Sequence, residues 1–265
     1  MNKKRKLLSA ERERLILQAL SDGVRSITEL SRSLNVSEAT VRRDLQALED
    51  QGKAQRVHGG AIQVRFPKIE PVFNEKASFH AAEKKQIAEH ALEFIEDNDV
   101  IFLDGGSTVQ ALARRLDARK NLTIVTNSMK AAAELMESGH RLILIGGEFR
   151  ALSQTLVGPM TAKLLDGLNI GKAFLGTIGF TVEQGISTTD PNEAFTKEQV
   201  MKRAEKVILL VDSSKIGSSS LAASGGIGDI DVIITDSNVP DATVRQLRKR
   251  NINVIGKNKQ TKEQP

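Results

Sequence analysis

The sequence predicts an α/β protein in which a small N-terminal winged helix-turn-helix is joined to a larger α/β domain with a mainly parallel sheet. Two observations lead to this prediction. Three helix-like segments and a hairpin with a Gly-Gly turn fill the first 65 residues. From about residue 81 on, apolar runs alternate with helical stretches. That alternation is typical of a parallel sheet covered on both faces.

The N-terminal helices are predicted from apolar spacing and capping residues. The first covers about residues 10–20, and the second begins at Ser26, which has capping-box spacing to Glu29. The third is capped by Ser37 and ended by Gly52. Only two residues separate the second helix from the third, so a tight turn with steeply crossing helices is expected.

A hairpin and a linker follow these helices. Two β-capable runs flank the Gly-Gly turn, and a helix-turn-helix followed by a hairpin is a winged helix. The next segment contains two prolines and little periodicity. The predicted domains are a winged helix-turn-helix over residues 1–65, a linker over 66–80, an α/β domain over 81–256 and a polar tail over 257–265.

Seven apolar runs are predicted as strands of the larger domain, and small, polar loops follow most of them. The predicted strands cover residues 100–103, 122–125, 142–145, 173–175, 207–211, 232–235 and 252–255.

Charge is unevenly distributed along the chain. The formal net charge is +5, and residues 1–70 hold 14 Lys and Arg against 9 Asp and Glu. The whole excess therefore lies in the N-terminal quarter. A basic module on a neutral body favours a polyanionic partner for that module, with a solvated basic surface as the alternative.

Composition excludes several kinds of site. The chain has no Cys, and its four His are not at metal-ligand spacing, so we expect no disulfide, no metal and no cofactor. No run approaches the roughly 20 apolar residues that span a bilayer, and the basic N-terminus has no apolar run behind it. We expect a cytoplasmic protein without a membrane partner.

The third predicted helix carries the residues for reading DNA. In a helix-turn-helix the first turns of the second helix face base edges in the major groove, where Arg reaches guanine or phosphate. The wing contacts the DNA backbone or the minor groove, and Lys3, Lys4, Arg5 and Lys6 are expected to add phosphate contacts. A small protein-binding bundle is the alternative. The candidate DNA-contacting residues are Ser37, Glu38, Ala39, Thr40, Arg42, Arg43, Arg56 and His58.

A second candidate site follows the first strand of the larger domain. Asp104–Thr108 has the sequence Asp-Gly-Gly-Ser-Thr and precedes a helix, so backbone N–H groups and hydroxyls converge as they do around a phosphate. Tight turns use the same residues, which is the alternative interpretation. Further polar loops after neighbouring strands are expected to line one crevice at the carboxyl edge of the sheet. The candidate crevice residues are Asp104, Gly105, Gly106, Ser107, Thr108, Asn127, Ser128, Gly146, Gly147, Glu193, Lys197, Asp212 and Lys215.

These motifs resemble a known family. The run Leu-Ser-Arg-Ser-Leu-Asn-Val-Ser-Glu-Ala-Thr-Val-Arg-Arg-Asp-Leu at residues 30–45, followed by Arg-Val-His-Gly-Gly at 56–60, is similar to the signature of the DeoR family of bacterial transcriptional regulators. The resemblance implies a sensor domain with a fold similar to ribose-5-phosphate isomerase and the CoA transferases. It also implies a phosphorylated sugar or related metabolite as inducer.

By position, the resemblance assigns the phosphate end of the effector to Asp104–Thr108 and to Asn127 with Ser128. It assigns the sugar hydroxyls to Asp212 and Lys215, with Glu193 and Lys197. The resulting hypothesis is a repressor of carbohydrate genes that leaves operator DNA when a sugar phosphate binds, acting as a homo-oligomer, a dimer or a tetramer. The alternative is a sugar-phosphate isomerase with an accessory DNA-binding domain.

Overall fold

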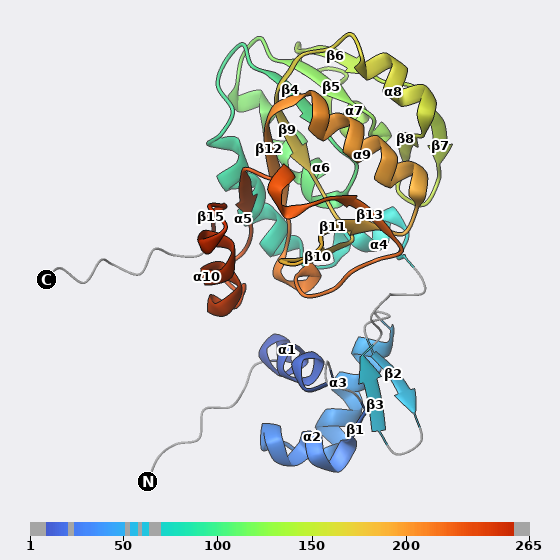
Figure 1. Cartoon of the computed structure of the whole chain (residues 1–265), viewed down its shortest axis with the longest axis vertical. Coiled ribbons are helices and arrows are strands. Elements are labelled where there is room, and N and C mark those ends of the chain that lie inside the picture. The colour runs from blue at the N-terminus through green and yellow to red at the C-terminus, as the bar shows by residue number, and fades with distance from the viewer. Residues whose placement is uncertain (1–8, 21–23, 51–53, 58–59, 64–69, 257–265) are drawn as a thin grey trace, which may run out of the picture. The chain divides into compact units, whose positions relative to one another are not determined.

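The computed structural model describes residues 9–20, 24–50, 54–57, 60–63 and 70–256. The chain folds as two compact units that divide between residues 69 and 70. Figure 1 shows the elements of each unit, and the two are described separately below. No helix in these described ranges is long and apolar enough to cross a membrane.

The first unit contains the predicted winged helix-turn-helix. Its helices are α1 (Ser9–Leu20), α2 (Ile27–Leu34) and α3 (Glu38–Asp50), and its strands are β1 (Arg25–Ser26), β2 (Ala54–Val57) and β3 (Gly60–Gln63). The hairpin of β2 and β3 is antiparallel, as predicted, and β1 adds a short third strand beside β3.

Local interactions explain where the helices of this unit begin and end. Ser26 and Glu29 form the predicted capping box at the start of α2. Asn35 ends α2 in the left-handed region at φ 52°, a conformation that Asn tolerates better than most residues. At Gly60 a Cβ atom would lie 2.2 Å from the carbonyl oxygen of Arg25, so only glycine lets β1 approach the wing. The predicted end of α3 at Gly52 lies outside the described residues.

All seven predicted strands of the larger unit form one parallel sheet. Its order is β15-β14-β12-β9-β4-β5-β6, and every neighbouring pair is parallel. The strands are β4 (Val100–Leu103), β5 (Thr123–Thr126), β6 (Arg141–Leu144), β9 (Ile170–Leu175), β12 (Ala204–Leu210), β14 (Val232–Ile234) and β15 (Asn253–Ile255).

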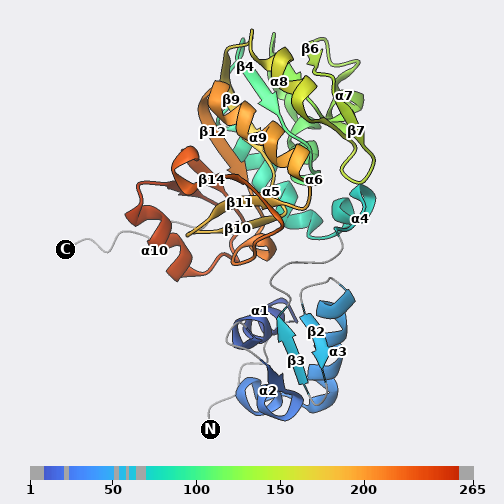
Figure 2. The same ribbon diagram turned by 45° about the vertical axis from the view of Figure 1, so that its right-hand side comes forward.

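Helices cover both faces of this sheet, which is visible in Figure 2. Successive strand residues point to opposite faces: Phe102 belongs to one buried apolar cluster, and its neighbours Ile101 and Leu103 belong to the other. The second of these clusters includes residues of α5 (Ala81–Leu92), α6 (Ser107–Ala113) and α7 (Met129–Leu135). The first includes residues of α8 (Pro159–Leu165), α9 (Pro191–Arg203) and α10 (Asp241–Lys249).

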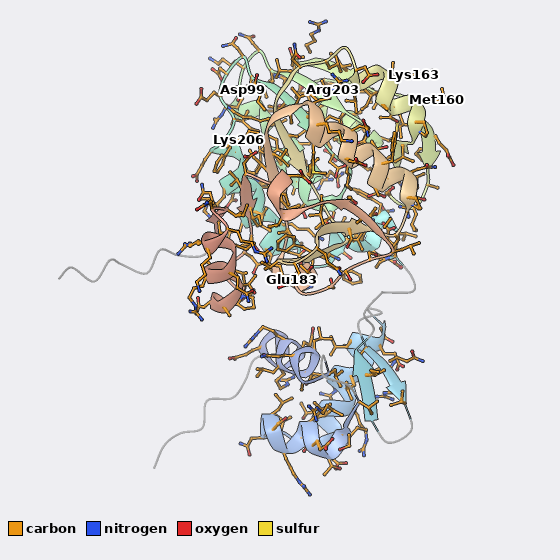
Figure 3. All side chains as sticks on the ribbon, viewed as in Figure 1. Asp99, Met160, Lys163, Glu183, Arg203 and Lys206 are labelled. Atoms are coloured by element: carbon orange, nitrogen blue, oxygen red, sulfur yellow. The ribbon has the colours of Figure 1, made fainter. Side chains whose placement is uncertain are left out.

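Charged side chains remain mostly on the outside of this unit, as the labelled examples in Figure 3 illustrate. Arg203 at the end of α9 pairs with Asp166 at 2.5 Å between Nη2 and Oδ1. The Lys206 ammonium lies 5.5 Å from the ring centre of Phe94. The apolar strands are thereby enclosed by helices whose outer faces carry the charge.

Several elements were not predicted. A hairpin of β7 (Glu148–Arg150) and β8 (Thr155–Val157) follows the edge strand β6. A small antiparallel sheet has the order β10-β11-β13, with β10 (Gly179–Thr181), β11 (Gly185–Thr188) and β13 (Ala222–Gly225). The strands of both are very short, and β13 pairs with β11 across a long stretch of sequence, so local periodicity did not reveal them.

The predicted linker over residues 66–80 is corrected by the structure. Residues 66–69 lie outside the described ranges. The rest of the segment belongs to the second unit and contains a helix, α4 (Phe73–Ser78), with Phe73 only 2% exposed. Its two prolines precede the helix without preventing it.

Candidate functional site

The outward face of α3 carries the candidate DNA-contacting arginines. Val41 and Leu45 are fully buried, whereas Arg42 and Arg43 are exposed. Arg42 donates from Nη2 to Glu38 Oε2 at 2.9 Å, but Arg43 has no hydrogen bond or ion pair within the described parts of the chain. Arg43 is therefore the arginine whose five donors are free for a partner.

Glu38 is held in place from two sides. Besides Arg42, it accepts a hydrogen bond of 2.8 Å from the Thr28 hydroxyl on α2. Thr28 was not among the predicted site residues, and its ten-residue separation from Glu38 leaves no local signal in the sequence. This contact ties the two helices of the motif together on their outer side.

Ser37 and Thr40 begin α3. The Ser37 hydroxyl accepts from the Thr40 backbone N–H at 3.2 Å, and the two hydroxyls lie 2.9 Å apart. Ser37 thus caps the helix, as predicted. Ala39 is exposed between them, and its methyl group leaves room on this face.

The described part of the wing is fastened to α3 through Arg56. Its guanidinium Nη2 donates to the Arg42 carbonyl at 2.8 Å, and its backbone N–H donates to Glu49 at 3.0 Å. Arg56 is thus a connection within the unit and is also exposed enough to meet a partner. His58 and the predicted basic residues 3–6 lie outside the described residues.

One ion pair holds α1 against α3 beneath this face. Arg12 on α1 donates to both carboxylate oxygens of Asp44 on α3, at 2.7 and 2.9 Å. Asp44 is 4% exposed, and its hydrogen bond raises the pKa of Arg12. A two-bond fork of this kind fixes the relative position of α1 and α3.

The second unit contains a pocket at the carboxyl ends of its three central strands. The strands β4 and β9 are neighbours in the sheet. After β4, the chain adds β5 and β6 toward one edge, and after β9 it adds β12 and β14 toward the other edge. The loops after β4 and β9 therefore diverge, and open α/β sheets bind ligands in the crevice at such a point. The pocket contains about 700 Å³ of space including its open mouth.

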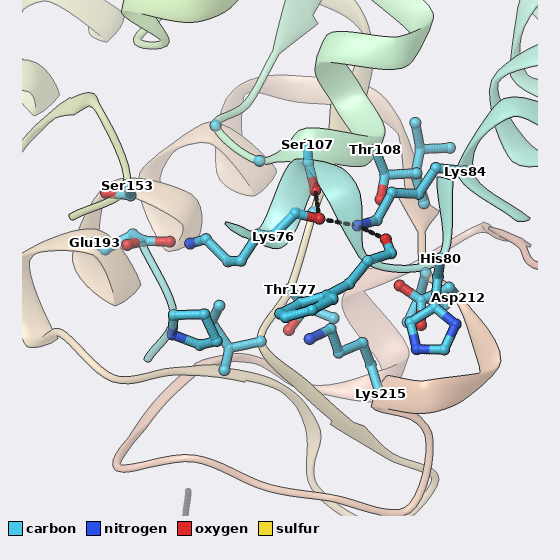
Figure 4. Close-up of a pocket in the computed structure, with 18 of the residues that line it drawn as sticks. Lys76, His80, Lys84, Ser107, Thr108, Ser153, Thr177, Glu193, Asp212 and Lys215 are labelled. Carbon is cyan, nitrogen blue, oxygen red and sulfur yellow. Dashed lines mark hydrogen bonds between the residues drawn. The ribbon is translucent and has the colours of Figure 1, made fainter. Parts of the chain in front are cut away.

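Figure 4 shows this pocket, whose walls come from six separate stretches of the chain. It is lined by Pro71, Lys76, Phe79, His80, Lys84, Gly105, Gly106, Ser107, Thr108, Ser153, Gly176, Thr177, Ile178, Glu193, Lys197, Leu210, Val211, Asp212 and Lys215.

Most of the predicted crevice residues line this pocket, but two predicted loops do not. Asn127, Ser128, Gly146 and Gly147 are absent from its walls, which corrects the expectation that all the strand-end loops share one crevice. Asn127 instead donates from Nδ2 to the carbonyl of Leu156 at 3.2 Å. Ser128 caps α7, and the carbonyl of Gly146 accepts from the Thr161 hydroxyl at 2.9 Å.

The β7–β8 hairpin explains this difference. Thr155 on β8 bridges to Ser128, and a Cβ atom on Gly105 would lie 2.1 Å from the Thr155 methyl carbon. The hairpin therefore separates the loops after β5 and β6 from the pocket. Ser153 of the same hairpin lines the pocket in their place.

Sequence reasoning missed a group of basic residues. Lys76, His80 and Lys84 line the pocket, and all three lie on or beside α4 and the start of α5. Lys76 and Lys84 are 9% and 6% exposed. Lys76 and His80 fall in the segment predicted as a linker, and Lys84 falls in the first predicted helical stretch of the larger domain, so none of the three was predicted as a site residue. Their only signal is an eight-residue spacing that brings them together across the turn between two helices.

Lysine charge dominates one side of the pocket. Lys84 is buried, which lowers the pKa of its ammonium to about 8 despite the attraction of Asp212, and Lys215 and Lys76 lower it further. Lys215 makes no ion pair or hydrogen bond through its ammonium within the described ranges. Burial raises the pKa of Asp212, but Lys215 and the Ser214 hydroxyl outweigh it and lower that pKa.

On the other side of the pocket, buried charged side chains pair with one another. Lys197 on α9 hydrogen-bonds Asp104 and lies 3.6 Å from Glu193, and its side chain is 3% exposed. Asp104 also accepts the backbone N–H of Gly176 at 3.0 Å, which joins the loops after β4 and β9. Burial alone would lower the pKa of Lys197, but Asp104 and Glu193 raise it, whereas burial raises the pKa of Glu193.

Asp104 thus acts differently from what was predicted for it. Its carboxylate lies behind the pocket wall, bonded to Lys197 and to the Gly176 N–H. It positions these two groups and is 2% exposed. Within the described ranges no group of three or more acidic or histidine side chains is arranged to hold a metal ion.

Comparisons with known proteins agree with both halves of this description. Residues 12–65 match the model of the DeoR-like helix-turn-helix domain, and residues 79–237 match that of the DeoR C terminal sensor domain. The HTH-type transcriptional regulator GlpR of Haloferax volcanii is 35% identical over 250 residues, which cover 94% of this chain and 98% of that protein.

Two further relatives are named as repressors. A putative aga operon transcriptional repressor of Escherichia coli O157:H7 is 34% identical, covering 93% of each chain. A lactose phosphotransferase system repressor of Staphylococcus epidermidis is 37% identical, covering 79% of this chain and 84% of its own. Among solved structures, ribose 5-phosphate isomerase A from Methanocaldococcus jannaschii is 20% identical with a TM-score of 0.38, covering 50% of this chain and 53% of that one.

Proposed function

Because the chain belongs to the DeoR family of transcriptional regulators, we propose that it is a repressor of carbohydrate genes whose hold on operator DNA is relieved by a phosphorylated sugar. The first unit supplies the DNA-binding face, with Arg43 aimed outward from α3. The second unit supplies the pocket. Two relatives named as repressors of the aga operon and of the lactose phosphotransferase system support a sugar-linked role.

One observation carries the effector class. Lys84 and Lys215 line the same pocket as the hydroxyls of Ser107 and Thr108. Lys76 lines it too, but its ammonium points toward Glu193 and pairs with Glu70. Acidic groups balance the pocket incompletely on this side, because Lys215 is without an ion pair among the described residues. A phosphate offers three strong acceptor oxygens and nearly two negative charges, which suits such a group of donors.

We assign the sugar hydroxyls to Asp212, whose carboxylate lines the pocket on the same side as Lys84 and Lys215. The Thr177 hydroxyl also lines the pocket, but it donates to the backbone carbonyls of Gly179 and Ser187. Carboxylates and hydroxyls accept and donate hydrogen bonds to sugar hydroxyls. The ion-paired trio of Asp104, Glu193 and Lys197 is buried, with Arg150 as a further partner of Glu193 at 3.2 Å, and Asp104 joins the loops after β4 and β9. We therefore assign the trio a positioning role.

We also infer that the protein acts as a homo-oligomer assembled through the second unit. Large apolar side chains are exposed on the neighbouring elements β6, β7 and α8: Leu144 at 42%, Phe149 at 55%, Leu164 at 51% and Met160, which Figure 3 labels, at 71%. Large apolar side chains exposed on neighbouring elements favour an interaction site. A paired DNA-binding unit would match a two-fold operator.

The test combines ligand binding with operator release. Calorimetry with D-ribose 5-phosphate, D-fructose 1-phosphate, D-fructose 6-phosphate and the matching free sugars should show binding of at least one phosphate ester and far weaker binding of its free sugar. Equal affinity for sugar and sugar phosphate would contradict the phosphate assignment. Measurable isomerisation of a bound sugar phosphate would instead favour an enzyme.

Matched variants connect the pocket to release. Ser107→Ala combined with Lys215→Ala should leave operator binding intact and abolish release by the sugar phosphate. Ser138→Ala combined with Lys163→Ala makes the same chemical changes outside the pocket walls and should release normally. Sedimentation that shows a monomer at micromolar concentration, with and without DNA, would contradict the oligomer.

A further inference from the structure

The end of α4 occupies hydrogen-bond donors of the pocket. Lys84 Nζ donates to the carbonyl oxygens of Lys76 and Phe79, the latter at 2.6 Å, and the Ser107 hydroxyl donates to the carbonyl of Lys76 at 3.2 Å. Figure 4 shows these three hydrogen bonds as dashed lines at one side of the pocket. The last carbonyls of a helix have no partner within it and carry partial negative charge. They therefore take the place that an anion would have.

The beginning of the same segment is anchored as well. Glu70 accepts from Lys76 Nζ at 2.5 Å, from Arg150 Nη2 at 2.7 Å and from the Thr189 hydroxyl. Its carboxylate is buried, with a side chain 1% exposed. Burial alone would raise the pKa of Glu70, but Arg150, Lys76 and Thr189 outweigh it and lower that pKa to about 2. Residues 70–80 are thus held at both ends by ionic and polar contacts.

The donors that hold the end of α4 cannot all serve a ligand at the same time. Ser107 has one O–H and donates either to the Lys76 carbonyl or to a ligand. Lys84 has three N–H donors, of which two are used by carbonyls. Because a phosphate is ionised, the hydrogen bond that it accepts from the Ser107 hydroxyl is roughly twice as strong as one between that hydroxyl and a neutral carbonyl. With the Lys84 ammonium it forms an ion pair, which a carbonyl cannot do.

We propose that the anionic group of the effector displaces the carbonyl oxygens of α4 from Ser107 and Lys84, so that residues 70–80 loosen when the effector binds. This proposal rests on the proposed function and names its regulation. Residue 70 is the first residue of the second unit, so the loosened segment is the one through which the chain passes toward the DNA-binding unit. The effector binds the loosened state more tightly than the held state, because its contacts with Ser107 and Lys84 form fully only when residues 70–80 have loosened.

Hydrogen exchange of the full-length protein tests the displacement directly. In the free protein the backbone N–H groups of Lys76 and Phe79 donate to the carbonyls of Val72 and Glu75. Saturating inorganic phosphate, or a sugar phosphate shown to bind by calorimetry, should speed exchange in residues 73–80 about tenfold. Residues 107–113 of α6 should not exchange faster.

Two different failures can be told apart. If calorimetry shows binding while residues 73–80 exchange at the same rate or more slowly, the displacement is wrong and the proposed effector class stands. If no phosphate compound binds at all, the proposed effector class fails and the displacement fails with it.

A variant outside the pocket walls provides a second measurement. Glu70→Gln removes the charge that anchors the segment without altering a pocket-lining residue. It should raise exchange in residues 73–80 of the ligand-free protein toward the liganded level, and it should tighten inorganic phosphate binding about fivefold. Operator release should then require less sugar phosphate, because the effector occupies the pocket at a lower concentration.

The matched control is Glu198→Gln, which removes a carboxylate from an exposed pair with Lys202 at 2.6 Å. It should change none of these quantities. Tighter phosphate binding by Glu70→Gln without faster exchange in residues 73–80 would overturn the proposal, because the freed Lys76 would then explain the gain alone.

Discussion

The two units present their functional groups in opposite ways. In the first, Arg42 and Arg43 are adjacent in the sequence, exposed and mounted on one helix. In the second, the pocket is assembled from residues as distant as Pro71 and Lys215, and several of its charges are already engaged with other protein groups. One surface is ready for a partner, whereas the other must exchange internal contacts for those of its ligand.

The difference fits the ligands proposed for the two units. A DNA duplex is large, so an exposed helix meets it without a cavity, and its phosphates supply the countercharge. A small anion must be surrounded, and the buried cations that surround it need internal partners while it is absent. Occupied donors therefore accompany a small-ligand site and are a natural place for a switch.

The largest expected effect separates the stability of the two units. Asp44→Ala removes the partner of Arg12 beneath α3, and breaking a buried ion pair costs about 4 kcal/mol. The first unit should lose most of its stability and operator binding should disappear, while sugar-phosphate binding by the second unit is retained. Unfolding followed by hydrogen exchange in each unit measures both. Asp50→Ala, at an exposed residue that accepts from Gln46, should change stability little, and loss of ligand binding in Asp44→Ala would show that the units are not independent.

Acid should act most strongly on the second unit. The pKa of Glu70 is lowered to about 2 in the folded protein, so the carboxylate stabilises the fold above its ordinary pKa near 4.5 and loses that contribution as the pH falls to about 2. The shift corresponds to about 3 kcal/mol. Urea unfolding followed by circular dichroism between pH 5 and pH 2 should show a steeper loss for the wild-type protein than for Glu70→Gln. Parallel curves would contradict the prediction.

The same comparison explains which features the sequence could predict. The strands of the sheet are apolar runs, and in α2 the capping residues Ser26 and Glu29 are three positions apart, so local pattern was sufficient for both. The exposed arginines of α3 were found for the same reason. All of these features can be recognised within a window of a few residues.

The pocket was only partly predictable because its second wall depends on distant contacts. The helix α4 is six residues long, and the side chain of its N-cap residue Val72 cannot accept a hydrogen bond. The segment is held by contacts such as Glu70 with Arg150, 80 positions away. Nothing local in the segment signals a helix that packs on a pocket. The loops after β5 and β6 were wrongly included because the β7–β8 hairpin, which separates them from the pocket, was not predicted.

Removing a single exposed arginine from the first unit should weaken operator binding without unfolding the unit. Arg43→Ala takes away an exposed side chain that makes no hydrogen bond or ion pair in the described part of the chain, so stability should stay unchanged while specific operator binding weakens by about 2 kcal/mol. Arg42→Ala should cost less, because Arg42 already pairs with Glu38. Competition binding with operator and random DNA measures both. Equal losses on both DNAs would show that Arg43 contacts phosphate and does not read bases.

The smallest expected effect concerns the charge of Lys84. Burial lowers the pKa of its ammonium to about 8, so the charged fraction falls from about one half at pH 8 to about one tenth at pH 9. A phosphate ester, whose second pKa is near 6, is fully ionised throughout this range. If Lys84 must be charged to bind it, sugar-phosphate affinity should fall about fivefold, or about 1 kcal/mol, between pH 8 and pH 9. Operator binding under the same conditions should change less, because the guanidinium groups on α3 stay charged.

Calorimetry in two buffers of different ionisation enthalpy should also show that binding takes up protons near pH 8. Lys84→Arg keeps a permanent charge at this position, so it should bind with a flat pH profile over the range. A wild-type profile that is equally flat would show that the ligand does not depend on Lys84, and it would return the end of α4 to a purely structural role.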